Sequence, residues 1–170
     1  MKYLSKPTLL WAATIILSAT FLRQVQQYIT TLGGRSLITL SVWCAFLLCG
    51  VALSIWLKRC SRKQLIAVVL ICSLAIGHAL QLELAEERVH IVLFGILGFL
   101  AYTDLRKQSN HTLLRAILFC TFIATIDETV QYFLPYRVGD LRDVLFGGIG
   151  SIWGILIAWV LMEGSIESSS

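Results

Sequence analysis

The stretch that decides the fold is LLRAILFCTFIATIDETVQYFLPYRVGDLRDVLFGGIGSIWGILIAWVLM, residues 113–162, in which two long apolar runs flank a polar centre. Six of the seventeen residues in that centre, DETVQYFLPYRVGDLRD at 127–143, are charged. Each apolar run approaches the length of a membrane-crossing helix, which needs about 20 apolar residues. The stretch therefore predicts two membrane helices joined at a charged turn, and the charges of that turn need an explanation.

The composition extends this pattern to the whole chain. Of its 170 residues, 57% are hydrophobic and 14% are charged, and the mean hydropathy is +0.79. An ordinary soluble domain has about 25% charged residues. We therefore expect an all-α protein, a polytopic membrane helix bundle with about six transmembrane helices. The apolar segments that predict them are Thr8–Leu22, Leu37–Leu57, Leu65–Leu82, Val89–Thr103, Leu113–Leu134 and Val144–Met162.

The basic residues predict the orientation of these helices, because cytoplasmic loops retain Lys and Arg. The loop KRCSRKQ, residues 58–64, carries four of them and is expected inside the cell. Alternation then places nine of the fourteen basic residues inside and five outside, with both termini cytoplasmic. The net charge of +4 reflects this asymmetry, so no nucleic-acid partner is expected. Residues 127–143 are expected on the extracytoplasmic side.

The chain is expected to form one integrated bundle. Residues 1–82 hold three apolar segments without a recognisable motif, residues 83–163 hold three with the motifs described below, and residues 164–170 form a disordered tail. A cleaved signal peptide is the alternative for the first segment, because Lys2 and Lys6 precede an apolar run that ends in small residues. Four of the five cysteines lie inside apolar segments and are expected to be apolar fillers.

Small residues indicate where helices pack closely, because they let two backbones approach each other. They gather in the fourth and sixth segments, at Gly95, Gly98, Gly147, Gly148, Gly150, Ser151 and Gly154. This grouping predicts close helix packing at both segments, with Gly150 and Gly154 at the spacing that lets a neighbouring helix approach.

Polar side chains form a constellation near the outer ends of the fourth and fifth segments. Asp127, Glu128 and Gln131 share one helical face, about 10 Å below the expected helix end at Leu134. Ionisable groups inside a membrane cost about 2.5–3.5 kcal/mol at the helix centre, so they turn inward and find partners. We expect the partner to be His90, which follows Glu87 by three residues on a helix that enters from the same side.

Several of these residues also have a structural interpretation. Asp140 is placed as an N-cap with Asp143 in a loose capping-box position, and Arg142 and Arg137 are expected to pair with these acids at an exposed rim. Outside the constellation, we interpret His78 as a satisfied interior histidine. Glu83 and Glu86 are interpreted as solvated loop acids.

The chemistry of the constellation is left open by the residue types. Acids, an imidazole and an arginine together suit acid–base work by His90 with Asp127 or Glu128, or the binding of a divalent cation and a phosphate. Arg137 suits an anionic group. The sequence specifies no cofactor and no metal.

The stretches ERVHIVLFGILGF, residues 87–99, and DETVQYFLPYRVGDLRDVLFGGIGSIWG, residues 127–154, resemble the VanZ-like family of small bacterial membrane proteins. The family pattern is an acid or lysine, a His one turn on, an Asp-Glu-x-x-Gln segment, a Pro-x-Arg turn and an Asp before a small-residue helix. Phe94 is a departure, because the family often has an aromatic hydroxyl there. On this chain the pattern falls on Glu87, His90, Asp127, Glu128, Gln131, Pro135, Arg137, Asp140 and Asp143.

The resemblance implies a multi-pass protein of the bacterial inner membrane, an accessory factor in glycopeptide (teicoplanin) sensitivity or envelope homeostasis. Its expected partners are membrane lipids and a lipid-linked cell-wall precursor or glycopeptide, bound at an outward-facing polar pocket. The alternative is a membrane enzyme that acts on a lipid phosphate or lipid-linked head group, so the sequence leaves open whether the protein is an enzyme. A proton-linked transporter is less favoured, since polar residues near the membrane midplane would then be expected.

Overall fold

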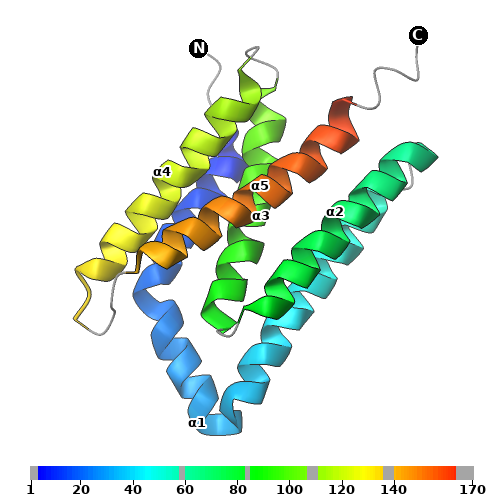
Figure 1. Ribbon diagram of the computed structural model, residues 1–170. Coiled ribbons are helices and arrows are strands. Elements are labelled where there is room, and N and C mark those ends of the chain that lie inside the picture. Colours follow the sequence, from blue (N-terminus) through cyan, green and yellow to red (C-terminus); the bar gives the residue numbers. More distant parts are fainter. Residues whose placement is uncertain (1–3, 58–59, 83–84, 107–110, 136–139, 164–170) are drawn as a thin grey trace.

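A computed structural model describes residues 4–57, 60–82, 85–106, 111–135 and 140–163. All regular secondary structure in these ranges is helical, which confirms the all-α prediction. Figure 1 shows that the first helix bends sharply, so the bundle has six helical arms. The tail predicted at residues 164–170 lies outside the described residues. The helices are α1 (Lys6–Leu57), α2 (Arg62–Gln81), α3 (Ala85–Leu105), α4 (Thr112–Tyr132) and α5 (Leu141–Glu163).

The first two expected segments are the two arms of one helix and not separate helices. α1 continues for 52 residues through the polar stretch 23–36 that separates them. Polar side chains do not end a helix, because its backbone groups bond to one another regardless of what they carry. In Figure 1 the first arm descends and the second returns beside α2, with the bend between them. The polar stretch 23–36 that separates the two apolar segments includes Gly33 and Gly34. Glycines are a common site for such bends.

Among the described residues, three stretches have the length and composition of a membrane-crossing helix: Arg62–Gln81, Glu87–Leu105 and Leu141–Met162. Large apolar side chains are also exposed along the bundle, among them Leu10 at 67% on α1 and Ile66 at 68% on α2. Apolar surface of this extent is typical of contact with a membrane. The structure therefore supports a membrane protein, and the number of crossings and their orientation stay predictions.

The α3–α5 crossing forms the centre of the bundle, as Figure 1 shows. A Cβ atom on Gly154 would lie 1.8 Å from the carbonyl oxygen of Gly95, and one on Gly98 would lie 2.3 Å from that of Ser151. These distances confirm that the small residues allow close packing. Gly148 is the exception, because nothing lies within 4 Å of its Cβ position.

Polar side chains also join helices at the end of the bundle where α1 begins and α3 ends. Asp104 Oδ2 accepts hydrogen bonds from the Ser5 backbone N–H at 2.8 Å, the Ser5 hydroxyl at 2.7 Å and the Thr8 hydroxyl at 2.6 Å. Gln64 does the same for α2 and α5, since its side-chain amide donates to the Val160 carbonyl at 3.0 Å. The sequence interpretation did not identify either tether.

Candidate functional site

Helix α4 contributes three buried polar side chains near its end. Asp127, Glu128 and Gln131 are 4%, 7% and 2% exposed, and the Gln131 amide donates to Asp127 Oδ2 at 3.1 Å. This confirms that they share one inward face. The helix ends at Tyr132, two residues before the predicted end at Leu134, because the chain turns ahead of Pro135. Asp127 therefore lies about 7.5 Å from the helix end, shallower than expected.

Helix α3 contributes Glu87 and His90, which are 4% and 9% exposed. The imidazole ring of His90 is parallel to the ring of Phe94, with centroids 5.9 Å apart. Phe94 is fully buried and forms part of the hydrophobic core. The imidazole faces the start of α5, where its Nε2 lies near Asp143.

The start of α5 joins the other two helices. Asp140 caps α5, because its Oδ1 accepts a hydrogen bond from the Arg142 backbone N–H at 2.9 Å, which confirms the N-cap prediction. In a capping box, the backbone N–H of Asp140 would donate to the side chain of Asp143. Here it donates instead to Glu128 of α4. A chain of hydrogen bonds thus runs from α4 into the first turn of α5.

Two charged side chains in that turn contact α3. Arg142 Nη2 lies 3.1 Å from Glu87 Oε1, and Asp143 Oδ2 lies 3.8 Å from His90 Nε2. Arg142 was expected to pair with the acids of its own turn, and this expectation was wrong for its guanidinium. Sequence spacing reveals only neighbours on one helix, whereas this contact depends on how closely α3 and α5 cross.

The structure thus brings together seven of the eight candidate residues in one polar cluster. Arg137, the eighth, lies outside the described residues, as do Glu83 and the side chain of Glu86. His78 differs from its interpretation as a satisfied histidine, because its Nδ1 is buried and has no hydrogen-bond partner among the described residues. The polar cluster consists of Glu87, His90, Asp127, Glu128, Gln131, Asp140 and Asp143, with Arg142 at its rim.

The polar cluster combines carboxylates, an imidazole and a guanidinium, groups that bind anions or transfer protons. In the part of the chain that the structure describes, no three His, Cys, Asp or Glu side chains are grouped to hold a metal ion. A cavity of about 400 Å³ lies elsewhere, between the second arm of α1, α2, α3 and α5, and its lining is apolar. The predicted outward-facing polar pocket stays a prediction.

The Glu87–Arg142 ion pair should respond unequally to removal of its two partners. We expect Arg142→Gln to lower the free energy of unfolding by about 2 kcal/mol, and Glu87→Gln by less. The carboxylate side chain is 5% exposed and the arginine 65%, so losing the arginine leaves a buried charge, whereas losing the acid leaves a cation that water solvates. Unfolding in mixed micelles measures both, and the double variant should recover part of the loss. Equal losses would contradict this account.

These features define a class: an all-helical bundle with helices that suit a membrane and a buried polar cluster at one end. Residues 7–162 match the model of the VanZ/LLP1 family. The chain belongs to that family. The match begins in the first arm of α1, so it extends well beyond residues 87–154, whose motifs carry the resemblance. No curated protein and no solved structure gave a significant match.

Proposed function

We propose that the protein is an accessory factor of the bacterial cell envelope that contributes to glycopeptide (teicoplanin) sensitivity. In this proposal the polar cluster faces the extracytoplasmic side and binds a lipid-linked cell-wall precursor or the glycopeptide. One observation carries the proposal: five polar side chains of α3 and α4 are buried at one end of a membrane bundle, and three of them, Glu87, His90 and Glu128, contact the start of α5. Apolar side chains at these positions would avoid the cost of inserting charge.

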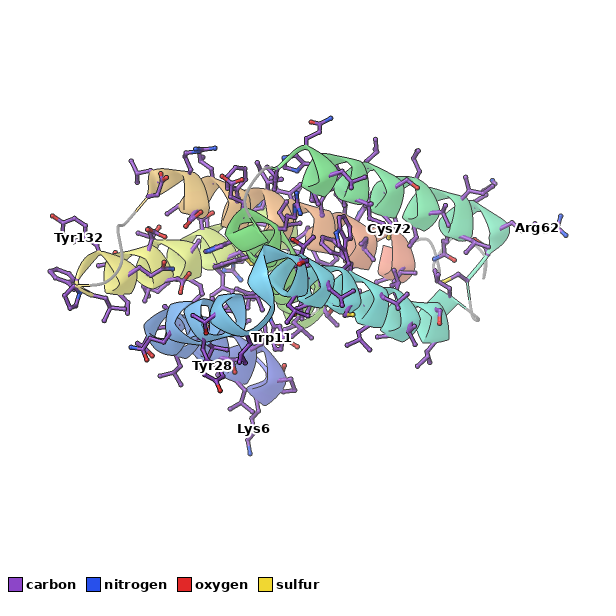
Figure 2. The ribbon with its side chains drawn as sticks, turned by 90° about the horizontal axis from the view of Figure 1, so that it is seen from below. Lys6, Trp11, Tyr28, Arg62, Cys72 and Tyr132 are labelled. Carbon is purple, nitrogen blue, oxygen red and sulfur yellow. The ribbon has the colours of Figure 1, made fainter. Side chains whose placement is uncertain are left out.

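Two features support the position of the polar cluster, one for the side of the membrane and one for its depth. The excess of Lys and Arg in the alternate loops favours cytoplasmic placement of the opposite end. Tyr132 and Phe133, beside the polar cluster, are 71% and 77% exposed, and exposed aromatic side chains are typical of the membrane–water boundary. Figure 2 shows Tyr132 projecting away from the bundle. A ligand arriving from the outer leaflet would meet the cluster first.

The alternative is a membrane enzyme that acts on a lipid phosphate or lipid-linked head group. The observation that favours it is the proximity of His90 to Asp143, 3.8 Å from Nε2 to Oδ2, because an imidazole beside a carboxylate is a common arrangement for acid–base catalysis. Asp127 and Glu128 would supply a second carboxyl group, and Arg142, 65% exposed, would meet the anion. Arg137 would also suit the anion, as the family pattern implies.

The experiment that separates the two compares His90→Gln and Asp127→Asn with the wild type at equal membrane levels. We expect the effect of the protein on teicoplanin susceptibility to be at least about tenfold smaller in each variant than in the wild type, since each removes an ionisable group of the cluster. His78→Gln is the matched control, because His78 lies on α2 outside the polar cluster. Mass spectrometry of lipids and wall precursors from the same cells supplies the second measurement.

Either outcome assigns the role. If a lipid or precursor accumulates or disappears with the wild type and returns to its basal level in both variants, the protein is an enzyme and that species is its substrate class. If lipid composition is unchanged while susceptibility still depends on His90 and Asp127, the binding role is supported. If both variants changed teicoplanin susceptibility as much as the wild type does, both proposals would be contradicted.

A further inference from the structure

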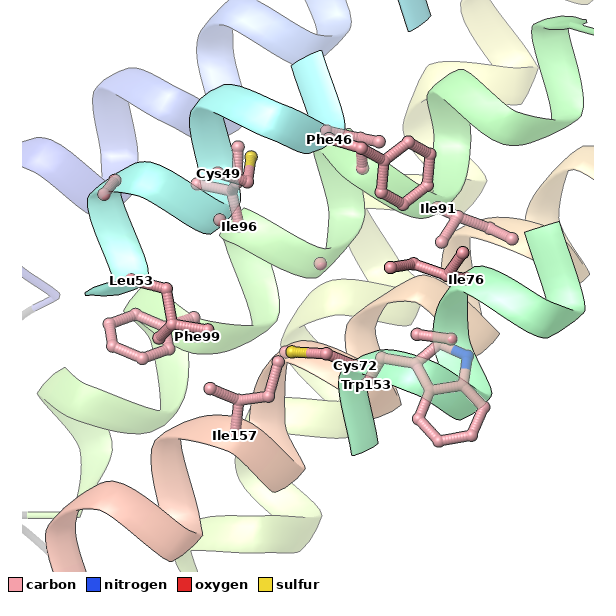
Figure 3. A pocket seen from close by; sticks show the side chains of 16 residues that line it. Phe46, Cys49, Leu53, Cys72, Ile76, Ile91, Ile96, Phe99, Trp153 and Ile157 are labelled. Carbon is pink, nitrogen blue, oxygen red and sulfur yellow. The ribbon is translucent and has the colours of Figure 1, made fainter. Parts of the chain in front are cut away.

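The apolar cavity is separate from the polar cluster and lies across the α3–α5 crossing from it. It measures about 400 Å³, within the range of about 300–1,000 Å³ that is typical of ligand sites. Figure 3 shows side chains from four helical arms around it, including Phe46 and Cys49 of α1 and Trp153 of α5. Water is disfavoured in such a space, because a buried water needs two to four polar partners.

The cavity is elongated along the helices. On α1 its lining extends from Phe46 to Leu53, and on α3 from Ile91 to Phe99. At 1.5 Å per residue, the α3 lining is about 12 Å long. Figure 3 shows Phe46, Ile91 and Ile76 together at one end of the cavity, and Leu53 and Phe99 at the other. In a membrane bundle, a cavity that is elongated along the helices is also roughly parallel to the hydrocarbon chains of the lipids.

A cation lies one helical turn beyond the end of the cavity that Phe46 and Ile91 mark. Arg88 precedes Ile91 by three residues on α3, and its guanidinium lies 5.9 Å from the centre of the Trp43 ring. Trp43 in turn is 5.4 Å from Phe46, ring to ring. Two carbonyls at the end of α2, those of Ala79 and Leu82, accept hydrogen bonds from the guanidinium.

The contacts that the described residues make with Arg88 hold it through neutral groups. Its hydrogen bonds in the structure use Nε and Nη2 and go to neutral carbonyl groups. Among the described residues, no carboxylate lies within ion-pair distance of it. A guanidinium in this position suits a phosphate group, which it binds through charge and paired N–H donors.

From this geometry we infer that the cavity holds an acyl chain of an anionic glycerophospholipid, whose phosphate pairs with Arg88. The cavity gives the chain apolar contacts along its length, and the guanidinium gives the head group a counter-charge one turn beyond. A void that stayed empty would forfeit these dispersion contacts. The lipid would pack the second arm of α1 against α2 and α3. The inference does not depend on the role proposed for the polar cluster.

Filling the cavity tests where the chain binds. Gly50 lines the cavity and nothing lies within 4 Å of its Cβ position, so Gly50→Leu occupies the space without displacing backbone. Gly77→Leu is the matched control, because Gly77 is equally open but does not line the cavity. Both changes favour helix formation, so both variants should fold.

The measurement is native mass spectrometry of protein purified from bilayers that contain phosphatidylglycerol. We expect the wild type and Gly77→Leu to retain one phosphatidylglycerol per chain, and Gly50→Leu to retain about tenfold less, which corresponds to about 1.4 kcal/mol of binding free energy. Phosphatidylglycerol with a photoreactive group within its acyl chain should crosslink to Ile96 or Phe99. Retention by Gly50→Leu at the wild-type level, or crosslinks confined to the exposed α2 residues Ile66 and Leu70, would overturn the inference.

A second comparison tests the head group. In bilayers with equal phosphatidylglycerol and phosphatidylcholine, the wild type should retain the anionic lipid about tenfold more than the zwitterionic one. Arg88→Gln should lose this preference and Arg88→Lys should keep most of it, because lysine preserves the charge. Equal retention of both lipids by the wild type, or exclusive retention of a polyprenyl phosphate from native membranes, would overturn the assignment of an anionic glycerophospholipid.

Discussion

Gly154→Ala is expected to lower the free energy of unfolding by about 3 kcal/mol or more, because among the described glycines its Cβ position lies nearest to another atom. The added Cβ would lie 1.8 Å from the Gly95 carbonyl oxygen, 2.7 Å from its carbon and 2.9 Å from the Phe99 backbone nitrogen. All three atoms belong to backbone, so no side-chain rotation relieves the overlap. α5 must move away from α3 along the crossing.

The matched control for this change is Gly148→Ala, on the same helix. Nothing lies within 4 Å of the Cβ position at Gly148, and alanine favours helix by up to about 1 kcal/mol over glycine. We therefore expect this variant to be as stable as the wild type or slightly more so. Unfolding in mixed micelles, followed by circular dichroism, measures both. Comparable losses in the two variants would indicate that helix flexibility and not close packing explains the glycines.

Separation of α3 from α5 would also disturb the polar cluster. Glu87 and His90 lie on α3, and their partners Arg142 and Asp143 lie on α5, on the same side of the closest approach. The distances of 3.1 Å and 3.8 Å between these pairs depend on the spacing that the glycines allow. The small-residue crossing is therefore what positions the candidate site.

Much of this arrangement could be predicted from helical periodicity. Asp127, Glu128 and Gln131 recur at the spacing of one helical face, and the structure buries all three. The glycines of the fourth and sixth segments indicated where helices pack closely, but the pairing of α3 with α5 came from the structure. Such patterns are local or rest on residue size, so they can be read from the chain without knowledge of the fold.

Contacts between helices were predicted less well. The Arg142–Glu87 pair joins residues 55 positions apart in sequence, and nothing in either segment favours this partner over the nearer Asp140. α1 was divided because its middle is polar, yet hydrogen bonding within the helix continues through that stretch. The cavity likewise depends on the second arm of α1 returning beside α2, which follows from the bend and not from the composition of either arm.

Asp104→Ala is expected to lower the free energy of unfolding by about 3 kcal/mol. Its Oδ2 accepts three hydrogen bonds from Ser5 and Thr8, which fix the beginning of α1 to the end of α3, and a bond to a charged group contributes about 1.5–3 kcal/mol. Thr8 is fully buried, so water cannot replace the lost acceptor at its hydroxyl without rearrangement. Asp104→Asn keeps a carbonyl oxygen as an acceptor and should lower the free energy of unfolding by about half as much.

Two threonines on α1 distinguish this tether from a general effect of hydroxyl groups. Thr8→Val should cost about 1–2 kcal/mol, because it removes a donor to the Asp104 carboxylate. Thr14→Val should change stability by less than about 0.5 kcal/mol, because that hydroxyl is exposed and bonds to Leu10 within its own helix. Unfolding in mixed micelles gives both values. If the two substitutions cost the same, Asp104 does not anchor α1, and the first arm is held by its apolar contacts with α3 and α4 and by the hydrogen bond from Trp11 Nε1 to the Leu93 carbonyl.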